Sequence, residues 1–146
     1  LKHDPHSRRI MTNTYNHADL SEMQLAPCAY SMTYNVTGNR LNAILNQRSQ
    51  DMLTANNWNV CQYAALLTMF AKASGLVPGE LVHVIADAHI YDRHVDIVKR
   101  LIEKKPYPAP EMQVEDITDF YKFTKNSFTA VDYRYHEFTD KIPVAI

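Results

Sequence analysis

A chain of 146 residues with 46% hydrophobic and 21% charged residues has the composition of a globular domain with a buried core, which argues against the disordered and membrane-spanning classes. Fifteen basic and sixteen acidic side chains give a net charge of −1, so no overall field attracts a nucleic-acid backbone and no nucleic acid is required as a partner. No apolar run approaches the ~20 residues of a membrane-spanning helix, and the first residues lack a secretion-signal pattern, so we expect no membrane contact and a cytoplasmic location.

The first third of the chain is rich in strand-forming sequence. A strand is expected over residues 8–15, followed by a polar loop or short helix over residues 16–26. Two further strand-like runs, 30–36 and 41–46, flank the tetrapeptide Thr37-Gly38-Asn39-Arg40, which predicts a β-hairpin.

The strongest helical pattern covers residues 58–74, where apolar side chains recur at intervals of three and four residues. Gly75 is expected to end this helix, because glycine tolerates the positive φ of a helix C-terminus. Pro78-Gly79 is then expected to turn the chain into a strand over residues 81–90.

The last third of the chain mixes both element types. Asp92 is a candidate cap for a second helix that runs to about Lys104, and the prolines within residues 106–110 predict an extended path. A helical patch near 117–123 and a strand near 128–135 complete the chain. The elements do not alternate as βαβ units, so we expect an α+β fold, a mixed sheet backed by a long buried helix, in a single domain over residues 1–146.

Cys28 is the candidate nucleophile, because it follows a proline and begins a strand. A cysteine buried without a chemical role is the commoner alternative. A thiol attacks as the thiolate, which a nearby guanidinium favours, and Arg48 is the candidate because the hairpin brings its strand beside Cys28. Cys61 has apolar neighbours in the helix and is expected in the core; both cysteines are expected to be free thiols.

Arginines supply two candidate anion sites. Arg48 and Ser49 place a forked donor beside a hydroxyl, which suits phosphate, although a solvated surface arginine is a common alternative. Arg8 and Arg9 form a second basic pair; adjacent strand residues point to opposite faces, so one of the two is free to serve a partner chain or a structural pair.

Polar residues further along the chain suit the base and sugar of a nucleotide. Asn59 carries the donor and acceptor that read a pyrimidine imide, although asparagine is also a preferred helix N-cap. His89 and Tyr91 lie two apart on the expected strand and share a face, where a half-exposed polar pair is the alternative. The seven histidines lack metal-ligand spacing, so we expect no metal, and no glycine-rich phosphate loop or Gly-x-Ser-x-Gly elbow occurs.

One ordered set of motifs runs through nearly the whole chain: Asp4-Pro5-His6-Ser7-Arg8-Arg9, Leu25-Ala26-Pro27-Cys28, Asn46-Gln47-Arg48-Ser49-Gln50-Asp51, Trp58-Asn59, Gly75-Leu76-x-x-Gly79-Glu80, Asp87-Ala88-His89-Ile90-Tyr91 and Pro143-Val144-Ala145-Ile146. This set resembles the thymidylate synthase family. The resemblance implies an α+β homodimer that methylates deoxyuridine monophosphate (dUMP) with 5,10-methylenetetrahydrofolate as one-carbon donor and reductant. Because the chain begins at Leu1, we expect it to be the later part of a longer catalytic domain.

The resemblance also implies a role for each motif residue. Cys28 would add to C6 of the uracil, and Asn59 would read the base and exclude cytosine. Arg48 and Ser49 would hold the phosphate, joined by Arg8 and Arg9 from the other subunit. The other implied nucleotide contacts are Gln50, Asp51, His89, Ile90 and Tyr91, with His89 and Tyr91 on the deoxyribose hydroxyl. For the folate, Asp51 would contact the ring and Ala145 would belong to a C-terminal lid.

Departures from the usual family pattern keep two alternatives open. Ala29 stands where a histidine usually follows the cysteine, Ala55-Asn56-Asn57-Trp58 replaces Gly-x-Pro-Phe, and Ala86 replaces a frequent glycine. One alternative is a related pyrimidine hydroxymethylase, of which Asn59 argues against the deoxycytidylate version. The other is a noncatalytic nucleotide-binding or RNA-contacting module, against which the neutral charge and Cys28 both weigh.

Overall fold

The chain divides into two compact units, Leu1–His89 and Ile90–Ile146. The computed structural model describes residues 1–144, and each unit has its own secondary structure. The expectation of one domain over residues 1–146 stays a prediction.

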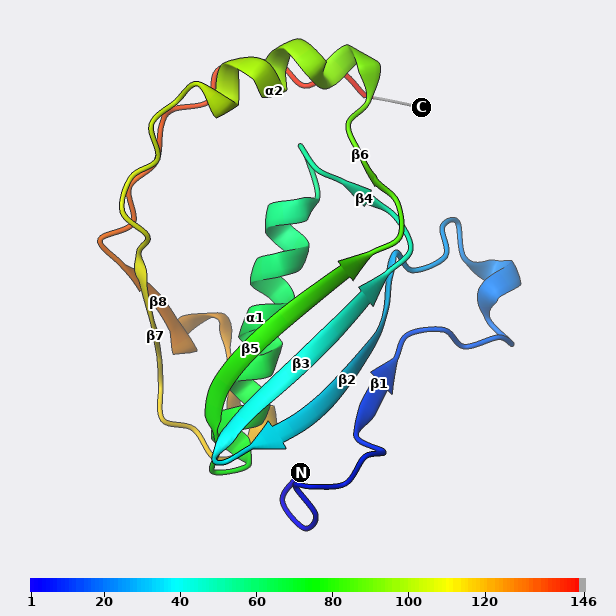
Figure 1. Ribbon diagram of the computed structural model, residues 1–146, viewed down its shortest axis with the longest axis vertical. Helices are drawn as coiled ribbons and strands as arrows, with labels where there is room; N and C mark the ends of the chain where they lie inside the picture. Colours follow the sequence, from blue (N-terminus) through cyan, green and yellow to red (C-terminus); the bar gives the residue numbers. More distant parts are fainter. Residues whose placement is uncertain (145–146) are drawn as a thin grey trace. The chain divides into compact units, whose positions relative to one another are not determined.

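The first unit contains a four-stranded mixed sheet with the order β1-β2-β3-β5 (Figure 1). Its strands are β1 (Met11–Asn13), β2 (Ala29–Thr37), β3 (Arg40–Gln47) and β5 (Val77–Ile85). β1, β2 and β3 pair antiparallel, whereas β3 and β5 run parallel. The predicted hairpin joins β2 to β3, and Gly38 has the positive φ of 62° that its tight turn requires.

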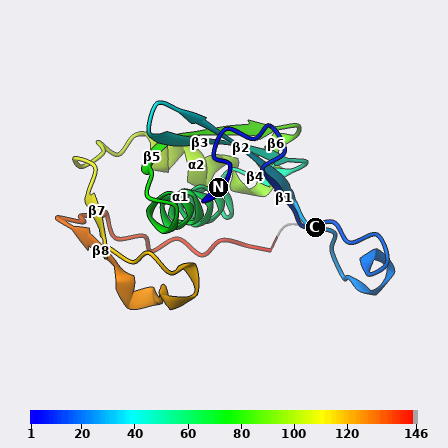
Figure 2. The ribbon, with the colours of Figure 1, turned by 90° about the horizontal axis from the view of Figure 1, so that it is seen from below.

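Helix α1 (Asn56–Ala73) connects β3 and β5 and covers one face of this sheet (Figure 2). It starts two residues earlier than the apolar periodicity predicts, because Asn56 and Asn57 already belong to its first turn. Gly75 ends it with a φ of 72°, and the backbone N–H of Leu76 donates to the Ala71 carbonyl oxygen at 2.8 Å.

The core lies between α1 and the sheet. Strand residues alternate between a face buried against α1 and a face turned away from it. The buried set is Ala29, Met32, Tyr34, Leu41, Ala43, Leu45, Leu67 and Ala71. The Tyr34 ring meets the edge of Phe70 at a centroid distance of 5.4 Å, and burial raises the pKa of the Tyr34 phenol. The α+β class, with a mixed sheet backed by the long helix, is confirmed.

The opposite face of the sheet exposes hydrophobic side chains among polar ones such as Thr33, Asn35 and Asn46. Its exposed hydrophobic side chains are Met11, Ile44, Val82 and Val84. Thr33 pairs with both Met11 and Ile44, and Ile44 pairs with Val82, so three of these side chains follow one row across the strands.

Two predictions about the region after α1 are wrong. Pro78-Gly79 is not a turn but part of β5, which already begins at Val77. Pairing with β3 overrides the local turn preference: the Asn42 side chain accepts a hydrogen bond from the Glu80 N–H at 2.9 Å, and a side chain at Gly79 would lie 2.8 Å from the Leu41 carbonyl oxygen. The strand expected over residues 81–90 ends at Ile85, and a separate β6 (Ala88–His89) pairs in parallel with β4 (Gln50–Asp51).

The N-terminal strand is also shorter than expected. Of residues 8–15 only Met11–Asn13 form a strand, while Arg8 and Arg9 lie in an exposed turn. The Arg9 N–H donates to the Ser7 hydroxyl oxygen at 3.4 Å, which is a turn contact. The argument that the two arginines point to opposite faces of a strand is therefore wrong. The polar segment that follows contains the 3-10 helix Leu20–Glu22.

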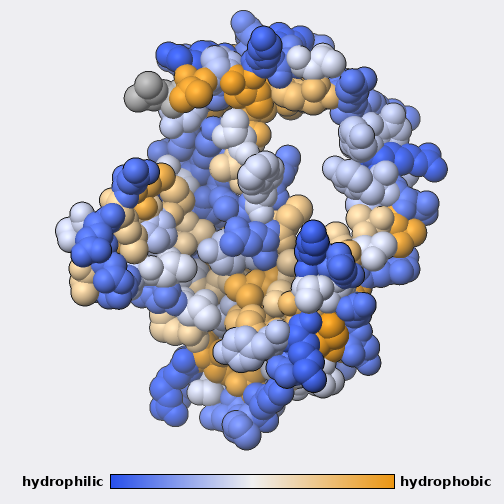
Figure 3. Space-filling view, turned by 180° about the vertical axis from the view of Figure 1, so that it is seen from behind, coloured by the Kyte–Doolittle hydropathy of each residue, from blue (hydrophilic) through white to orange (hydrophobic). Residues whose placement is uncertain are grey.

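The second unit has one short helix, α2 (Val95–Ile102), after the 3-10 turn Asp92–His94. Asp92 makes no side-chain cap, so its predicted capping role is wrong. Ile97 is the buried hydrophobic residue of α2, whereas Asp96, Lys99 and Arg100 are exposed. Hydrophilic residues line the top edge of the molecule in Figure 3. The helix is thus amphipathic.

An antiparallel pair of strands follows α2. It consists of β7 (Glu111–Val114), which the proline-rich pattern did not predict as a strand, and β8 (Phe128–Val131). The predicted strand over 128–135 ends early because Asp132 adopts a positive φ of 57°. Between the two strands lie the 3-10 helices Phe120–Lys122 and Lys125–Ser127.

Candidate active site

Cys28 and Arg48 lie on neighbouring chain segments at one end of the hairpin. Cys28 is half-buried immediately before β2, and its carbonyl oxygen accepts the backbone N–H of Arg48 at 2.9 Å. The guanidinium donates from Nε to the Pro27 carbonyl oxygen at 3.2 Å and from Nη2 to the Ala26 carbonyl oxygen at 2.7 Å. Arg48 therefore holds the segment that carries the thiol, and a guanidinium has five N–H donors, so three remain for an anion.

The rest of the Arg48 motif forms a short bend between β3 and β4. Ser49 is half-buried, and its carbonyl oxygen accepts a hydrogen bond from the Gln47 side chain at 2.8 Å. Gln50 is 1% exposed, and its amide donates to the Asp51 carbonyl oxygen at 3.3 Å. The Asp51 carboxylate accepts the backbone N–H groups of Leu53 and Thr54 at 2.9 and 3.2 Å, and also the Thr54 hydroxyl. These bonds fix the loop that leads into α1.

Asn59 lies half-buried in the first turn of α1. The helix N-cap is Ala55, so the alternative that Asn59 is the cap is wrong. Instead its Oδ1 accepts a hydrogen bond from Gln47 Nε2 at 3.2 Å. Gln47 is 2% exposed, and its Oε1 lies 2.9 Å from His83 Nε2 on β5. Burial lowers the pKa of His83 below its usual 6.5, which keeps the ring neutral at pH 7.

Gln47 and His83 were not predicted as site residues. Gln47 belongs to the Asn46–Asp51 motif, which was a usable signal, whereas His83 was considered only as a metal ligand and rejected. Their contact depends on the parallel pairing of β3 and β5, which brings together residues 36 positions apart.

The nucleotide-sugar candidates do not share a strand. His89 is in β6, and its Nδ1 lies 3.4 Å from both the Asp87 carboxylate and the Asp87 carbonyl oxygen. Ile90 is exposed, and Tyr91 precedes the 3-10 turn of the second unit, where its ring meets the edge of His94. The inference that His89 and Tyr91 share a strand face is therefore wrong, because the strand ends at His89.

The second cysteine, Cys61, is exposed on α1 and not in the core as expected. Both cysteines are free thiols, as predicted. Among residues 1–144 no three histidine, cysteine or acidic side chains lie close enough to hold a metal ion. Within the same residues no helix has the length and apolar character needed to cross a bilayer.

The C-terminal segment is held to the second unit by two donors. Arg93 Nη1 donates to the Val144 carbonyl oxygen at 2.7 Å, and His94 Nε2 contacts the Pro143 carbonyl oxygen at 2.8 Å. Ala145, expected to belong to the folate lid, lies outside the described residues.

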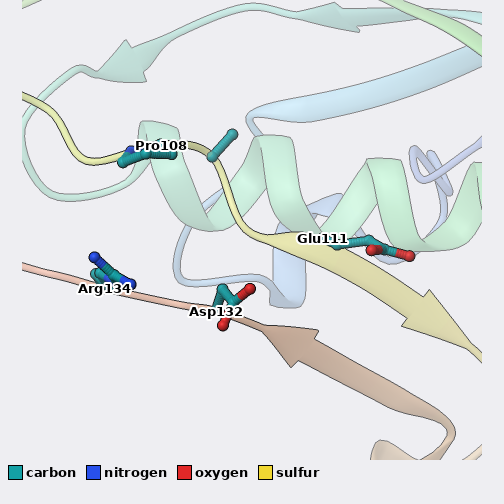
Figure 4. A pocket seen from close by; sticks show the side chains of 5 residues that line it. Pro108, Glu111, Asp132 and Arg134 are labelled. Carbon is teal, nitrogen blue, oxygen red and sulfur yellow. The ribbon is translucent and has the colours of Figure 1, made fainter.

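A separate cavity of about 260 Å³ lies beside β7 and the end of β8. Figure 4 shows Pro108 and Glu111 on one side of it and Asp132 and Arg134 on the other. All its lining residues are exposed, so its charged groups stay solvated and exert little chemical influence. The candidate active site is therefore the end of the β2–β3 hairpin with the start of α1.

That arrangement suits an enzyme that attacks an anionic substrate with a thiol: the candidate nucleophile Cys28 is half-buried, and Arg48, which has spare donors, lies on the neighbouring segment. The Asn59 amide is oriented by its hydrogen bond from Gln47, the residue before Arg48. The family model for thymidylate synthase matches residues 1–146. The chain therefore belongs to the thymidylate synthase family.

Individual relatives agree with this assignment. The thymidylate synthase of Bacillus licheniformis is 39% identical over 136 residues, which cover 92% of this chain and 49% of that protein. The bifunctional dihydrofolate reductase-thymidylate synthase of Paramecium tetraurelia is 37% identical over 137 residues, which cover 94% of this chain and 30% of that protein. The structure of the thermostable thymidylate synthase A from Bacillus subtilis matches with a TM-score of 0.91 at 35% identity, over 96% of this chain and 51% of that one. The chain spans about half the length, or less, of these relatives.

Proposed function

We propose that this chain carries the nucleophile and the main nucleotide contacts of a thymidylate synthase, which methylates dUMP with 5,10-methylenetetrahydrofolate as one-carbon donor and reductant. The observation that carries the proposal is the pairing of Cys28 with Arg48, whose guanidinium holds the two carbonyl groups before the thiol. Family membership over the whole chain supports the same reaction.

In this reaction Cys28 adds as the thiolate to C6 of the uracil, and C5 becomes nucleophilic enough to take the one-carbon unit. The remaining N–H groups of Arg48 and the Ser49 hydroxyl bind the phosphate, which places the base over the thiol. Asn59 reads the base. His89, oriented by Asp87, and Tyr91 bind the deoxyribose hydroxyl.

The remaining motif residues complete the nucleotide and folate contacts. Gln50 and Ile90 flank the phosphate-binding and sugar-binding residues within their motifs, and Asp51 contacts both substrates. Ala145 folds over the folate as part of a C-terminal lid, which excludes water from the reacting centre. The hydrogen bonds from Arg93 and His94 to the carbonyl groups just before Ala145 give this lid an anchor.

We also propose a homodimer in which a second copy covers the exposed face of the sheet. Met11, Ile44, Val82 and Val84 are exposed hydrophobic side chains on that face, and such side chains lose their contact with water on association. Arg8 and Arg9, exposed in a turn just before β1, then reach the phosphate of the partner's site. Two free cysteines suit a reducing cytoplasm.

The proposal is tested by trapping the covalent adduct. The full-length protein is incubated with 5-fluoro-dUMP and methylenetetrahydrofolate, and its mass is measured before and after digestion. We expect a ternary adduct on the peptide that contains Cys28 and an unmodified Cys61 peptide. No mass shift, with nucleotide binding retained, would leave a noncatalytic binder, and hydroxymethylated dUMP as the product from the natural substrate would indicate the hydroxymethylase.

A further inference from the structure

The side chain of Gln47 joins the two strands and the helix that build the site. It projects from the end of β3 toward α1, where it contacts three acceptors and one ring nitrogen. Its Nε2 donates to the Ser49 carbonyl oxygen at 2.8 Å, to Asn59 Oδ1 at 3.2 Å and to Gln50 Oε1. Its Oε1 lies 2.9 Å from His83 Nε2. All these groups belong to the unit Leu1–His89.

The hydrogen-bonding capacity of these partners determines how the side-chain amides of Gln47 and Asn59 are oriented. A backbone carbonyl oxygen can only accept a hydrogen bond, so the Ser49 contact requires the Gln47 nitrogen on that side. Gln47 Oε1 is then the end that meets His83, and it can only accept, so His83 carries its proton on Nε2. At the other end, Asn59 must present Oδ1 to the Gln47 nitrogen, because two NH₂ groups facing each other would repel.

We propose that Gln47 and His83 are positioning residues that set the orientation of the Asn59 amide and thereby the choice between uracil and cytosine. The inference rests on the proposed function, in which Asn59 reads the base. When Oδ1 accepts a hydrogen bond from Gln47, the Asn59 NH₂ group and the second lone pair of Oδ1 remain available to hydrogen-bond the base. A uracil offers an N3–H donor and an O4 acceptor, which match this pair.

Cytosine presents the reverse pattern, an N3 acceptor and an N4 amino donor. It matches an Asn59 amide rotated by half a turn, which the Gln47 nitrogen excludes in this arrangement. Burial disfavours the charged form of His83, so the ring carries one N–H, and the Gln47 oxygen places that N–H on Nε2. Selectivity for uracil is thus supported by the Nε2 proton of His83, a residue of β5 that lies outside the quoted motifs.

The decisive variant is Gln47→Glu. A carboxylate can only accept, so the Asn59 NH₂ group turns toward it and Oδ1 takes the place of the NH₂ group at the base. Dissociation constants for dUMP and dCMP are measured by calorimetry on the full-length protein. We expect the ratio of the dCMP constant to the dUMP constant to fall by about tenfold or more, which is the effect of exchanging matched for mismatched hydrogen bonds.

Two variants of His83 test the contribution of its hydrogen bond to Gln47. His83→Leu removes one of the two contacts that orient the Gln47 amide and leaves the Ser49 carbonyl oxygen in place, so the same ratio should fall less than in Gln47→Glu, by about threefold. His83→Gln restores a donor and should keep the wild-type ratio. Gln113→Glu makes the same charge change at an exposed glutamine of β7 and serves as the matched control. Circular dichroism checks that each variant is folded, and the His83 pair decides the question alone if Gln47→Glu is not.

The outcomes separate this inference from the proposed function. If the wild type prefers dUMP but every folded variant weakens both nucleotides by the same factor, or changes neither, Gln47 and His83 only pack the site and the inference is overturned. If the wild type binds neither nucleotide, the proposed function fails and the inference falls with it. A shift toward dCMP in His83→Leu that His83→Gln reverses supports the inference, because a purely structural role would not alter the ratio.

Discussion

The two units of the chain are stabilised in different ways. Leu1–His89 buries a continuous set of sheet and helix side chains, with Leu41, Leu45 and Ala71 fully removed from solvent. In Ile90–Ile146 the buried hydrophobic residue among those described is Ile97. That unit is tied together by polar links such as the Arg100–Asp140 ion pair at 3.0 Å and the Lys104 bond to the Glu137 carbonyl oxygen at 3.3 Å, which are exposed to water.

This difference matches the division of work in the proposed enzyme. Groups that must keep a fixed geometry, the thiol and the amide that reads the base, belong to the unit with the buried core. The segment proposed as a lid belongs to the unit that we expect to open more easily, because exposed polar contacts stabilise weakly and local unfolding starts where little apolar surface is buried. A lid that closes after the substrates have bound must open and close readily, and low local stability allows this.

The largest expected effect is on chemistry in the first unit. Cys28→Ser should lower turnover by about a thousandfold or more, because a serine hydroxyl does not ionise near neutral pH. Affinity for dUMP should stay within about tenfold, since in the proposed function the phosphate contacts of Arg48 carry most of the ground-state binding. Steady-state rates and calorimetric dissociation constants measure the two quantities.

Cys61→Ser is the matched control, because it makes the same chemical change at a thiol of α1 that is exposed to solvent. It should leave both rate and affinity unchanged. If Cys28→Ser lost as much affinity as rate, Cys28 would be part of the ground-state pocket and not its nucleophile.

The next effect concerns the core itself. Leu45→Ala should lower the free energy of unfolding by about 3 kcal/mol, because a fully buried leucine leaves a cavity that its neighbours fill only in part. Urea denaturation followed by circular dichroism measures the change.

Ile97→Ala in α2 should instead raise hydrogen exchange in residues 90–102 without a comparable change in global stability.

Ile44→Ala is the control for Leu45, because Ile44 is the preceding residue on the exposed face of the same strand. It should cost little in the stability of a single chain but weaken the proposed dimer, which sedimentation measures. An equal loss of stability from Ile44→Ala and Leu45→Ala would show that the two faces of the sheet are not distinguished as the structure indicates.

Local signals predicted the parts of the fold that depend on local forces. The hairpin and α1 could be predicted because glycines at Gly38 and Gly75 supply the positive φ that these ends need, and because the α1 periodicity is long. Pro78-Gly79 was misinterpreted because its conformation is set by β3, a strand far away in sequence. Cys61 was placed in the core because its neighbours are apolar, although the helix turns it toward solvent.

The difference between local and long-range determinants also holds in the candidate active site. The neighbourhood of Cys28 and Arg48 follows from the hairpin, which sequence can predict. The contact between Gln47 and His83 follows from the parallel pairing of β3 with β5 across α1, and the motif pattern contains no information about that pairing. The orientation of the Asn59 amide therefore became visible only with the hydrogen bonds of the folded chain.

The smallest expected effect is the pH dependence of stability caused by His83. Because burial lowers the pKa of His83 in the folded chain below 6.5, the unfolded chain binds the proton more tightly. The contribution of this residue to stability is therefore fully present above pH 6.5 and is lost as the pH falls toward the lowered pKa of the folded state. The ring is partly exposed, so the effect should stay below about 1 kcal/mol.

Urea denaturation at pH 7.5 and 5.5 measures this effect as the difference between wild type and His83→Gln, in which the contributions of all other titrating groups cancel. The wild type should lose more stability on acidification than the variant; an equal or smaller loss would contradict the assignment. Protonated His83 still donates from Nε2, since both ring nitrogens then carry hydrogens. Acidification should consequently weaken the fold around Gln47 while the Asn59 amide, and with it the preference for uracil, keeps its orientation.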